Sequence, residues 1–447
     1  PKSQVKEEDL FSSESGFRDA LTGIYALMGR VETYGGNSTM GFMDMLAQTY
    51  SKVDYDYEDA LKYNYKEEHV IVDTMWSSNY NAIANCNYLL QNIEKKGSVM
   101  SERLRNVVEG EALALRAFLH FDLLRGYAPS YKMGKDEPAI PYVREVTNSP
   151  VVQSTVAEVL EYILTDLKTA QALLKPVDPI GPSFAEYNDK LEYGMDEYIT
   201  DDGFWLYRKS RLNYYGVTAL MARVYLCQEN LTDALACAQE VIDSKRFEFM
   251  NDSINNVYAY RNLSYIEKMA RHEYVSSLYV YDLKEGRSDL FFKNLASCEC
   301  VIAEGRKASI YSGMGQDLDI RSKNWFETPA GSATEYVNKY MRGTQIPLLK
   351  LSEMYLIAAE ASGDIRYLET LRANRGYATD PLPAGANLQD EITKEYQKEF
   401  IAEGQLFYYY KRRNMAILPI TSTSMNRATY VLPVPDNELE FGNFKQN

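Results

Sequence analysis

The stretch GEALALRAFLHFDLLRGYAP, Gly110 to Pro129, decides the fold, because it sets charged residues within an apolar helical pattern. In the longer segment 103–127, apolar residues recur at near-helical spacing (Leu104, Val108, Leu115 and Leu119), and small residues lie between them (Gly110, Ala112, Ala114 and Ala117). Small residues let a second helix approach closely. An unpaired buried charge costs several kcal/mol, so we predict that Glu111 and Arg116 form structural ion pairs between adjacent helices. Neither is expected to contact a ligand.

Composition limits both the fold and the partners. The chain has 447 residues, 45% of them apolar, which suffices for one large helical domain or two closely packed ones. The 63 acidic residues outnumber 48 basic ones, and the net charge of -15 opposes binding to nucleic acid or to an anionic membrane surface. No apolar run is long enough to span a bilayer, and the first residues lack the apolar core of a signal peptide. Five cysteines without a CxxC pair indicate no disulfide framework.

Helical periodicity dominates the first part of the chain, in residues 17–28, 70–93, 103–127 and 155–174. Two later segments, 212–244 and 347–376, each combine an apolar helix with internal alanines, a polar turn and a second helix. This is the unit of tetratricopeptide-type repeats, here with irregular spacing between copies. An ordinary helical bundle is the alternative.

Three long interruptions separate these helices, in residues 34–65, 176–207 and 246–335. They lack helical periodicity and are rich in Gly, Asn, Asp, Ser and Tyr, which indicates functional loops, and their aromatic residues argue against disorder. A short strand pair is expected around His272 to Leu283. The predicted fold is mainly α: tetratricopeptide-like helix-turn-helix repeats form an α-helical scaffold with long loop insertions and minor β-strand.

Catalytic signatures are missing from the sequence. It holds no HExxH, GxSxG, P-loop or GxGxxG motif, and of its three histidines His120 is expected in the core and His69 and His272 at the surface. A helical glycosidase needs only two carboxylates, and acidic runs supply candidates (Asp54, Asp56 and Asp59; Asp196, Glu197, Asp201 and Asp202). Such runs are usually solvated surface, so we predict that the protein is not an enzyme. Asp201 and Asp202 could help to hold a calcium ion, but no EF-hand spacing supports it, and no metal or cofactor is predicted.

The opening stretch resembles the signature helix of the SusD and RagB family, nutrient-binding outer-membrane lipoproteins of Bacteroidota. The residues that match its pattern are Glu111, Arg116, Ala117, Phe121, Asp122, Leu123, Arg125 and Tyr127. Four further segments resemble family motifs in the same order: GFRDALTGIYALM, WSSNYNAIANCNYLL, IPLLKLSEMYLIAAEA and YVLPVPDNELEFGNFKQN.

The resemblance covers nearly the whole chain and implies one SusD-like unit over residues 1–447. Residues 1–210 correspond to an N-terminal part with helical repeats, and residues 211–447 to a C-terminal SusD/RagB part with loop insertions and late repeats. The sequence departs from the family pattern in EYQKEF and EGQLFYYYKR, at Tyr396, Leu406 and Tyr409, and has Phe441 and Gly442 where the family usually has Asn-Pro.

The function implied by the resemblance is nutrient uptake in polysaccharide utilisation. The protein is expected to bind a glycan, as oligosaccharide or polysaccharide, at the cell surface and to deliver it to a SusC-like TonB-dependent outer-membrane transporter. The resemblance also implies a lipid anchor on an upstream cysteine, absent from this sequence, that holds the protein on the extracellular face of the outer membrane. The alternatives are a peptide-binding RagB-like uptake protein, a helical glycoside hydrolase and an intracellular repeat scaffold that binds peptides.

Aromatic residues within the interruptions are the candidates for ligand contact. The sequence contains 37 tyrosines, and a flat aromatic ring can stack on the apolar face of a sugar while neighbouring polar groups bind its hydroxyls. We therefore predict a binding surface formed by Tyr55, Tyr57, Trp205, Tyr279 and Trp325. Trp76 lies in a helical motif and is expected in the core.

Overall fold

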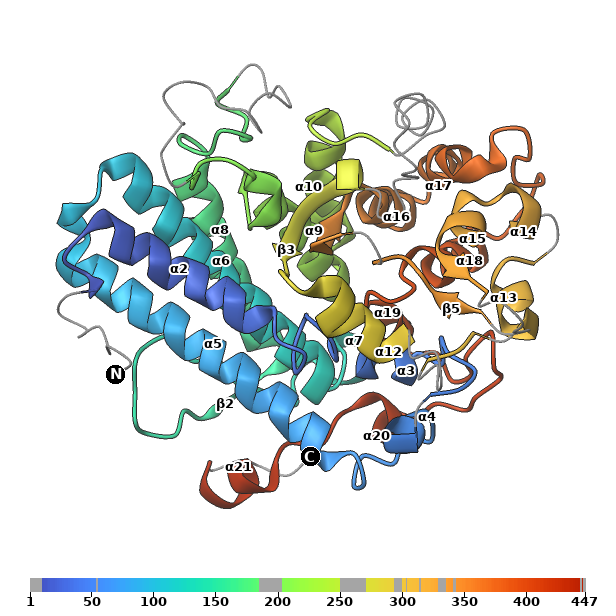
Figure 1. Ribbon diagram of the computed structural model, residues 1–447, viewed down its shortest axis with the longest axis horizontal. Coiled ribbons are helices and arrows are strands. Elements are labelled where there is room, and N and C mark those ends of the chain that lie inside the picture. The colour runs from blue at the N-terminus through green and yellow to red at the C-terminus, as the bar shows by residue number, and fades with distance from the viewer. Residues whose placement is uncertain are drawn as a thin grey trace.

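Helices account for most of the architecture, as Figure 1 shows for the computed structural model. The structure describes residues 10–53, 55–184, 203–249, 271–292, 300–302, 304–312, 315–328, 335–340, 343–442 and 444. The longer helices are α2 (Glu14–Met28), α5 (His69–Lys96), α6 (Glu102–Tyr127), α8 (Val156–Leu174), α9 (Tyr214–Cys227), α10 (Leu231–Asp243), α16 (Leu351–Ser362), α17 (Ile365–Arg372), α18 (Leu388–Glu399) and α19 (Leu406–Arg413).

These helices pack on one another largely in chain order. Helix α5 packs on α6, α6 on α8, α8 on α9, α9 on α10, α10 on α16 and α16 on α17. The pairs α9–α10 and α16–α17 are the helix-turn-helix units expected from residues 212–244 and 347–376. The prediction of a mainly helical, repeat-based scaffold with little strand is therefore confirmed.

Local sequence signals fix where the long helices begin. The Ser101 hydroxyl accepts a hydrogen bond from the Leu104 amide at the start of α6, and Asn213 accepts one from the Gly216 amide at the start of α9. Thr155 and Glu158 form a reciprocal capping box at the start of α8. Such caps satisfy amide groups that have no partner within the helix, so each helix starts at a defined residue.

Strands form three small antiparallel pairs: β1 (Pro138–Pro141) with β2 (Gln153–Thr155), β3 (Tyr274–Tyr279) with β6 (Gln345–Lys350), and β4 (Phe326–Glu327) with β5 (Tyr336–Val337). The strand expected around 272–283 is present as β3, but its partner β6 is distant in sequence, so the expected local strand pair was wrong. Strand β6 also replaces the start of the helix expected from residue 347. A short apolar run such as IPLLK suits a buried strand as well as a helix.

The first predicted insertion, residues 34–65, is largely core. Residues 33–50 are buried without interruption, and Tyr34 and Tyr50 are among the most buried tyrosines. A Cβ atom on Gly35 would lie 2.1 Å from the Gly29 carbonyl oxygen, so this position requires glycine. This segment also contains the short helices α3 (Phe42–Leu46) and α4 (Glu58–Leu61). This part of the predicted loop insertion is buried because close backbone packing, which glycine allows, leaves no periodic pattern in the sequence.

Short helices occupy the described parts of the remaining chain: α7 (Tyr131–Gly134), α12 (Asp289–Phe292), α13 (Glu304–Ile310), α14 (Gly315–Leu318), α15 (Ile320–Asn324), α20 (Arg427–Tyr430) and α21 (Asp436–Phe441). The division of the chain near residue 210 stays a prediction. Helices α8 and α9, on either side of it, pack directly against each other. Among the described helices, none combines the length and the apolar character that crossing a membrane requires.

Candidate functional site

A cavity of about 350 Å³ lies between helix α2, the segment 203–211 and the end of strand β3. Its lining residues are Arg18, Asp19, Thr22, Tyr25, Ala26, Gly203, Phe204, Leu206, Tyr207, Ser210, Arg211 and Tyr279. Two other described cavities have volumes of only about 40 and 30 Å³. Since ligand pockets usually measure about 300 to 1,000 Å³, the first cavity is the candidate site.

Two tyrosine rings line this cavity and remain open to solvent. The side chains of Tyr207 and Tyr279 are 58% and 54% exposed, whereas Phe204 in the same wall is buried. Tyr207 has a left-handed backbone conformation with a φ of 56°. This conformation is uncommon for a bulky residue and is often found at functional sites. The two exposed rings can stack on the apolar face of a sugar.

Glu111 fixes the segment that carries the cavity wall. Its carboxylate accepts hydrogen bonds from the Arg208 guanidinium and from the Tyr25 hydroxyl, the latter at 2.7 Å. Arg208 also binds Asp178, at 3.0 and 2.9 Å, and the Tyr25 hydroxyl accepts a bond from the Leu212 amide at 2.9 Å. Burial alone would lower the pKa of Arg208, but the two carboxylates outweigh it and raise the pKa above its usual value. The Glu111 carboxylate, on the apolar helix α6, therefore holds residues 208–212 in place through Arg208 and Tyr25.

Strand β3 anchors the same segment from the other side. The hydroxyl groups of Ser276 and Ser277 donate to the carbonyls of Arg211 and Lys209, at 3.0 and 2.8 Å. The side-chain Nδ2 of Asn213 donates to the Val275 carbonyl at 2.7 Å. The backbone beneath the cavity is thus bonded to both α6 and β3. A rigid backbone keeps the exposed rings in place without a ligand.

Arg116 belongs to a separate buried network. Its guanidinium binds both oxygens of Asp166 at 2.7 Å and also donates to Asn87 and to the Arg144 carbonyl, each at 2.9 Å. These partners join α6 to α8 and α5. Glu111 and Arg116 therefore lie in two distinct buried ion-pair networks, and Arg116 lines none of the described cavities.

His120, on the same helix, is held neutral. Its Nε2 accepts a hydrogen bond from the Val143 amide at 3.0 Å, and its Nδ1 lies 2.8 Å from the Arg116 carbonyl, to which it donates. Burial, together with the nearby Arg116 and Arg144 charges, lowers the pKa of His120 to about 3. A neutral histidine with both ring nitrogens occupied serves the fold and leaves no free base for catalysis.

The five aromatic residues predicted to bind ligand do not form one surface. Tyr279 lines the cavity, and Trp205, which is buried, packs edge-on against Phe204 in the cavity wall. Tyr55 is 83% exposed outside this cavity, and Tyr57 packs near the Phe291 ring.

Trp325 is only 2% exposed, with the Lys339 ammonium group 3.9 Å from its ring centroid, so its faces are not open to a ligand. Trp76 is likewise buried, as expected.

Sequence reasoning missed Phe204, Tyr207, Arg18 and Arg211. The run GFWLYRKSR, residues 203–211, places three aromatic residues among basic ones, and this local combination could have drawn attention to Tyr207 and Arg211. Arg18 could not be found in this way, because it lies on the exposed side of an ordinary amphipathic helix.

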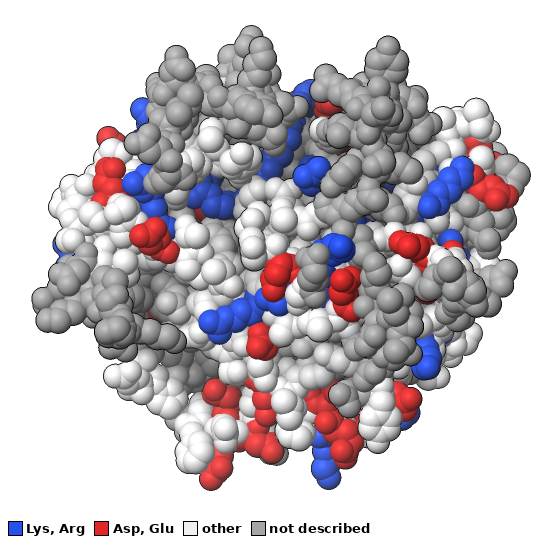
Figure 2. All heavy atoms as spheres, in the orientation of Figure 1, with Lys and Arg blue, Asp and Glu red and all other residues white. Residues whose placement is uncertain are grey.

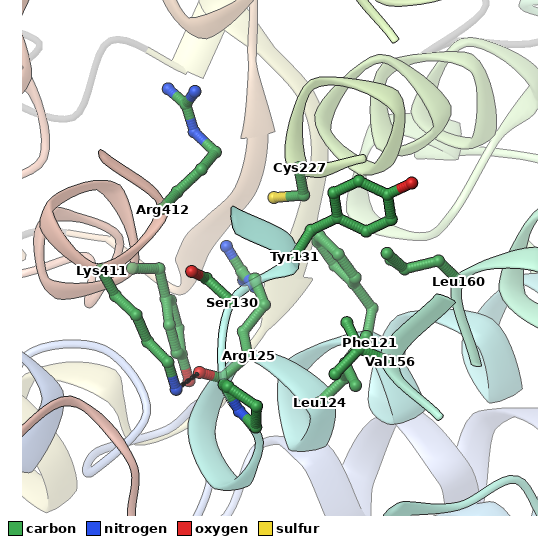
Figure 3. Close-up of a pocket in the computed structure, with 12 residues that line it drawn as sticks. Phe121, Leu124, Arg125, Ser130, Tyr131, Val156, Leu160, Cys227, Lys411 and Arg412 are labelled. Carbon is green, nitrogen blue, oxygen red and sulfur yellow. Dashed lines mark hydrogen bonds between the residues drawn. The ribbon is translucent and has the colours of Figure 1, made fainter. Parts of the chain in front are cut away.

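The small cavity in Figure 3 is a structural gap between helices. Its basic side chains are already engaged: Arg125 binds Asp122 and Gln405, and Arg412 binds Glu360 at 2.8 and 2.7 Å. Lys411 donates to the carbonyls of Arg125 and Gly126, at 2.5 and 3.1 Å, in the last turn of α6. A cation at a helix C-terminus satisfies free carbonyls, so these charges stabilise the fold.

Most of the metal-binding and paired-carboxylate candidates lie outside the part of the chain that the structure describes. Within the described ranges, no group of three or more His, Cys, Asp or Glu side chains is placed to hold a metal ion. The acids Asp54, Asp196, Glu197, Asp201 and Asp202 lie outside the described residues.

Known proteins resemble this chain in part of its sequence and in the fold of nearly its whole length. Residues 2–178 match the family described as SusD-like, starch-binding and associating with the outer membrane. No curated protein matches the sequence.

Among solved structures, a SusD superfamily protein from Bacteroides thetaiotaomicron is similar over 96% of this chain and 98% of its own, with 20% identity and a TM-score of 0.74. A putative sugar binding protein from Bacteroides vulgatus is similar over 96% of both chains, with 22% identity and a TM-score of 0.71. A laminarin binding SusD-like protein shares 18% identity over 97% of this chain and 99% of its own, with a TM-score of 0.70. Residues 2–178 therefore match the SusD-like family, and the chain as a whole shares the fold of these solved structures.

Proposed function

We propose that the protein binds glycans in the cavity between α2, residues 203–211 and β3. The observation that carries the proposal is the pair of exposed rings, Tyr207 and Tyr279, that line a cavity large enough for sugar units. Hydroxyl and guanidinium groups of Ser210 and Arg211 lie in the same lining and can bind sugar hydroxyls. The family description and the sugar-binding and laminarin-binding names of similar structures support this function.

Alanine variants of the two rings test the site. A panel of purified polysaccharides is first screened for binding by affinity electrophoresis, and the ligand found is then titrated calorimetrically. Tyr207→Ala and Tyr279→Ala should each weaken binding by about 1 to 3 kcal/mol, the range for an aromatic contact at the centre of an interface. Phe441→Ala, at a ring that is 69% exposed on α21, is the matched control and should leave binding unchanged.

The variant Tyr55→Ala tests whether the ligand binds in the cavity or on the wider aromatic surface predicted from the sequence. Tyr55 is more exposed than either cavity ring but does not line the cavity. If Tyr55→Ala abolishes binding while Tyr207→Ala and Tyr279→Ala do not weaken it, the ligand binds elsewhere.

Binding is proposed to occur without turnover. Incubation of the purified protein with the bound polysaccharide should release no reducing ends above the level of a protein-free sample. A steady release that depends on protein concentration would support a glycoside hydrolase instead.

Delivery to a SusC-like TonB-dependent transporter is the second part of the proposal. The family description places related proteins at the outer membrane, and a surface binder there needs a partner that moves its ligand inward. Gentle detergent extraction of cells followed by affinity capture of this protein should recover a large outer-membrane barrel protein. Repeated recovery of the protein alone at low salt would contradict the partnership.

We further propose that a lipid on a cysteine upstream of this sequence anchors the protein to the extracellular face of the outer membrane. Cells that express the full-length precursor and grow with an alkyne-tagged fatty acid should yield a labelled protein that protease added outside intact cells can reach. An unlabelled protein, or one protected in intact cells, would contradict this placement.

A further inference from the structure

The charges that line the cavity differ from those of the chain as a whole. The sequence has a net charge of -15, yet the charged residues in the lining are two arginines and one aspartate, Arg18, Arg211 and Asp19. On the face shown in Figure 2, basic side chains gather toward the upper left, over the region of α2 and the segment before α9, whereas acidic ones dominate the lower edge. The cavity is therefore a locally basic site in an acidic protein.

Arg211 has an incomplete set of partners among the described residues. Its side chain is 13% exposed and donates one hydrogen bond, to the Phe204 carbonyl at 2.6 Å. The nearest carboxylate, Glu111, is 3.8 Å away, beyond hydrogen-bond distance, and already accepts bonds from Arg208 and Tyr25. Burial lowers the pKa of Arg211, Glu111 opposes this effect, and Arg208 adds to it. A poorly hydrated guanidinium with free donors gains more from an anion than a solvated one does.

Arg18 brings a second positive charge to the same wall. The guanidinium carbons of Arg211 and Arg18 lie 4.0 and 5.7 Å from the centroid of the Phe204 ring, so both positive charges flank the same ring of the cavity wall. The exposed rings of Tyr207 and Tyr279 line the same cavity. A carboxylate or sulfate projects from the edge of a sugar ring, and a sugar stacked on a tyrosine can therefore direct such a group toward an arginine.

We infer that the cavity selects an acidic glycan, whose sugars carry carboxylate or sulfate groups, and that Arg211, assisted by Arg18, binds the anionic group. This inference rests on the proposed glycan-binding function and adds the charge of the ligand. Non-specific electrostatic attraction to the whole protein would not give this preference for acidic glycans, because a protein with a net charge of -15 repels polyanions in general.

Matched pairs of polymers test the inference by calorimetry. Polygalacturonate is compared with its carboxyl-reduced form, and dextran sulfate with dextran, so that each pair differs only in charge and the two pairs separate carboxylate from sulfate. The protein should bind at least one acidic polymer about 10- to 100-fold more tightly than its neutral partner, the range for a hydrogen bond to a charged group. Arg211→Gln should remove most of this preference.

Two further variants keep the test decisive. Arg18→Gln should reduce the same preference and provides a second measurement if Arg211→Gln does not fold. Arg366→Gln is the control, because Arg366 is 87% exposed on α17, pairs with Asp364 and does not line the cavity.

The outcomes separate this inference from the function on which it rests. Equal or tighter binding of the neutral partner, still weakened by Tyr207→Ala, would overturn the acidic preference and leave glycan binding intact. Binding of poly-glutamate through Arg211 with no binding of any polysaccharide would overturn both and favour a peptide ligand. No binding of any of these polymers would also count against both.

Discussion

Arg208 and Arg211 lie three residues apart in the sequence, yet their surroundings give one a structural role and the other a place in the cavity lining. Arg208 is 2% exposed and is bonded to two carboxylates, those of Glu111 and Asp178. The Arg211 guanidinium lies 3.8 Å from the Glu111 carboxylate, without a hydrogen bond to it, and lines the cavity. A buried charge whose donors are all bonded holds the fold, whereas one that keeps unused donors at a cavity wall is available to a ligand.

Removing Arg208 should give the largest loss of stability. Arg208→Met leaves Glu111 and Asp178 buried without their cation, and a broken buried pair typically costs about 3 to 5 kcal/mol. The free energy of unfolding in urea, measured for wild type and variant, gives this difference. A loss below about 1 kcal/mol, the value of a surface pair, would mean that the network does not hold the segment 208–212.

Trp325→Ala should cost a comparable amount, because Trp325 is a buried core residue. Replacing a buried tryptophan with alanine usually costs about 3 to 5 kcal/mol through lost contacts and the cavity left behind. The same urea titration measures it. Normal glycan affinity in the fraction that folds would separate this residue from the cavity rings, whereas lost affinity with unchanged stability would restore it as a ligand contact.

Acidification should destabilise the protein through His120. Its folded-state pKa of about 3 lies below the value near 6.5 of an unfolded chain, so stability is full above pH 6.5 and falls as the pH drops toward 3. Between pH 7.5 and pH 5 this single group should remove about 2 kcal/mol. The His120→Gln variant lacks this contribution, so its stability should fall less over the same interval. An identical fall in both proteins would show that His120 is not held neutral.

The smallest stability effect is expected at Arg211. Arg211→Gln removes one hydrogen bond to a carbonyl, a 3.8 Å charge contact and a contact with the Phe204 ring, but it also removes a largely buried charge. The losses and the gain oppose each other, so the free energy of unfolding should change by less than about 1.5 kcal/mol. Combined with the binding measurements, this contrast with Arg208→Met tests the division of roles directly. A loss as large as that of Arg208→Met would make Arg211 part of the structural network.

Periodic segments of the fold could be predicted closely from the sequence. The helix expected over 103–127 is α6, Glu102–Tyr127, and the one expected over 155–174 is α8, Val156–Leu174. In such segments one face is apolar and the cap residues are local, so the sequence alone carries the information. Strand β6 and the buried segment 33–50 depend on partners far along the chain, and no local pattern marks them.

The candidate site was less predictable for the same reason. Tyr279 and Trp325 both lie in the third predicted insertion, residues 246–335, yet one is 54% exposed at the end of β3 and the other is buried against Lys339. Tyr207 becomes exposed through a left-handed backbone conformation that the sequence does not signal. Aromatic residues could be nominated from composition, but which rings face solvent depends on tertiary packing.

A crystal structure of the protein with a bound oligosaccharide would show directly whether the ligand lies in the cavity between α2, residues 203–211 and β3. The oligosaccharide is a fragment of the polymer that binds most tightly in the screen. We expect a sugar ring stacked on Tyr207 or Tyr279, with an anionic group of the sugar within hydrogen-bond distance of Arg211. A sugar bound at Tyr55 and Tyr57, or anywhere else outside the cavity between α2, residues 203–211 and β3, would contradict it.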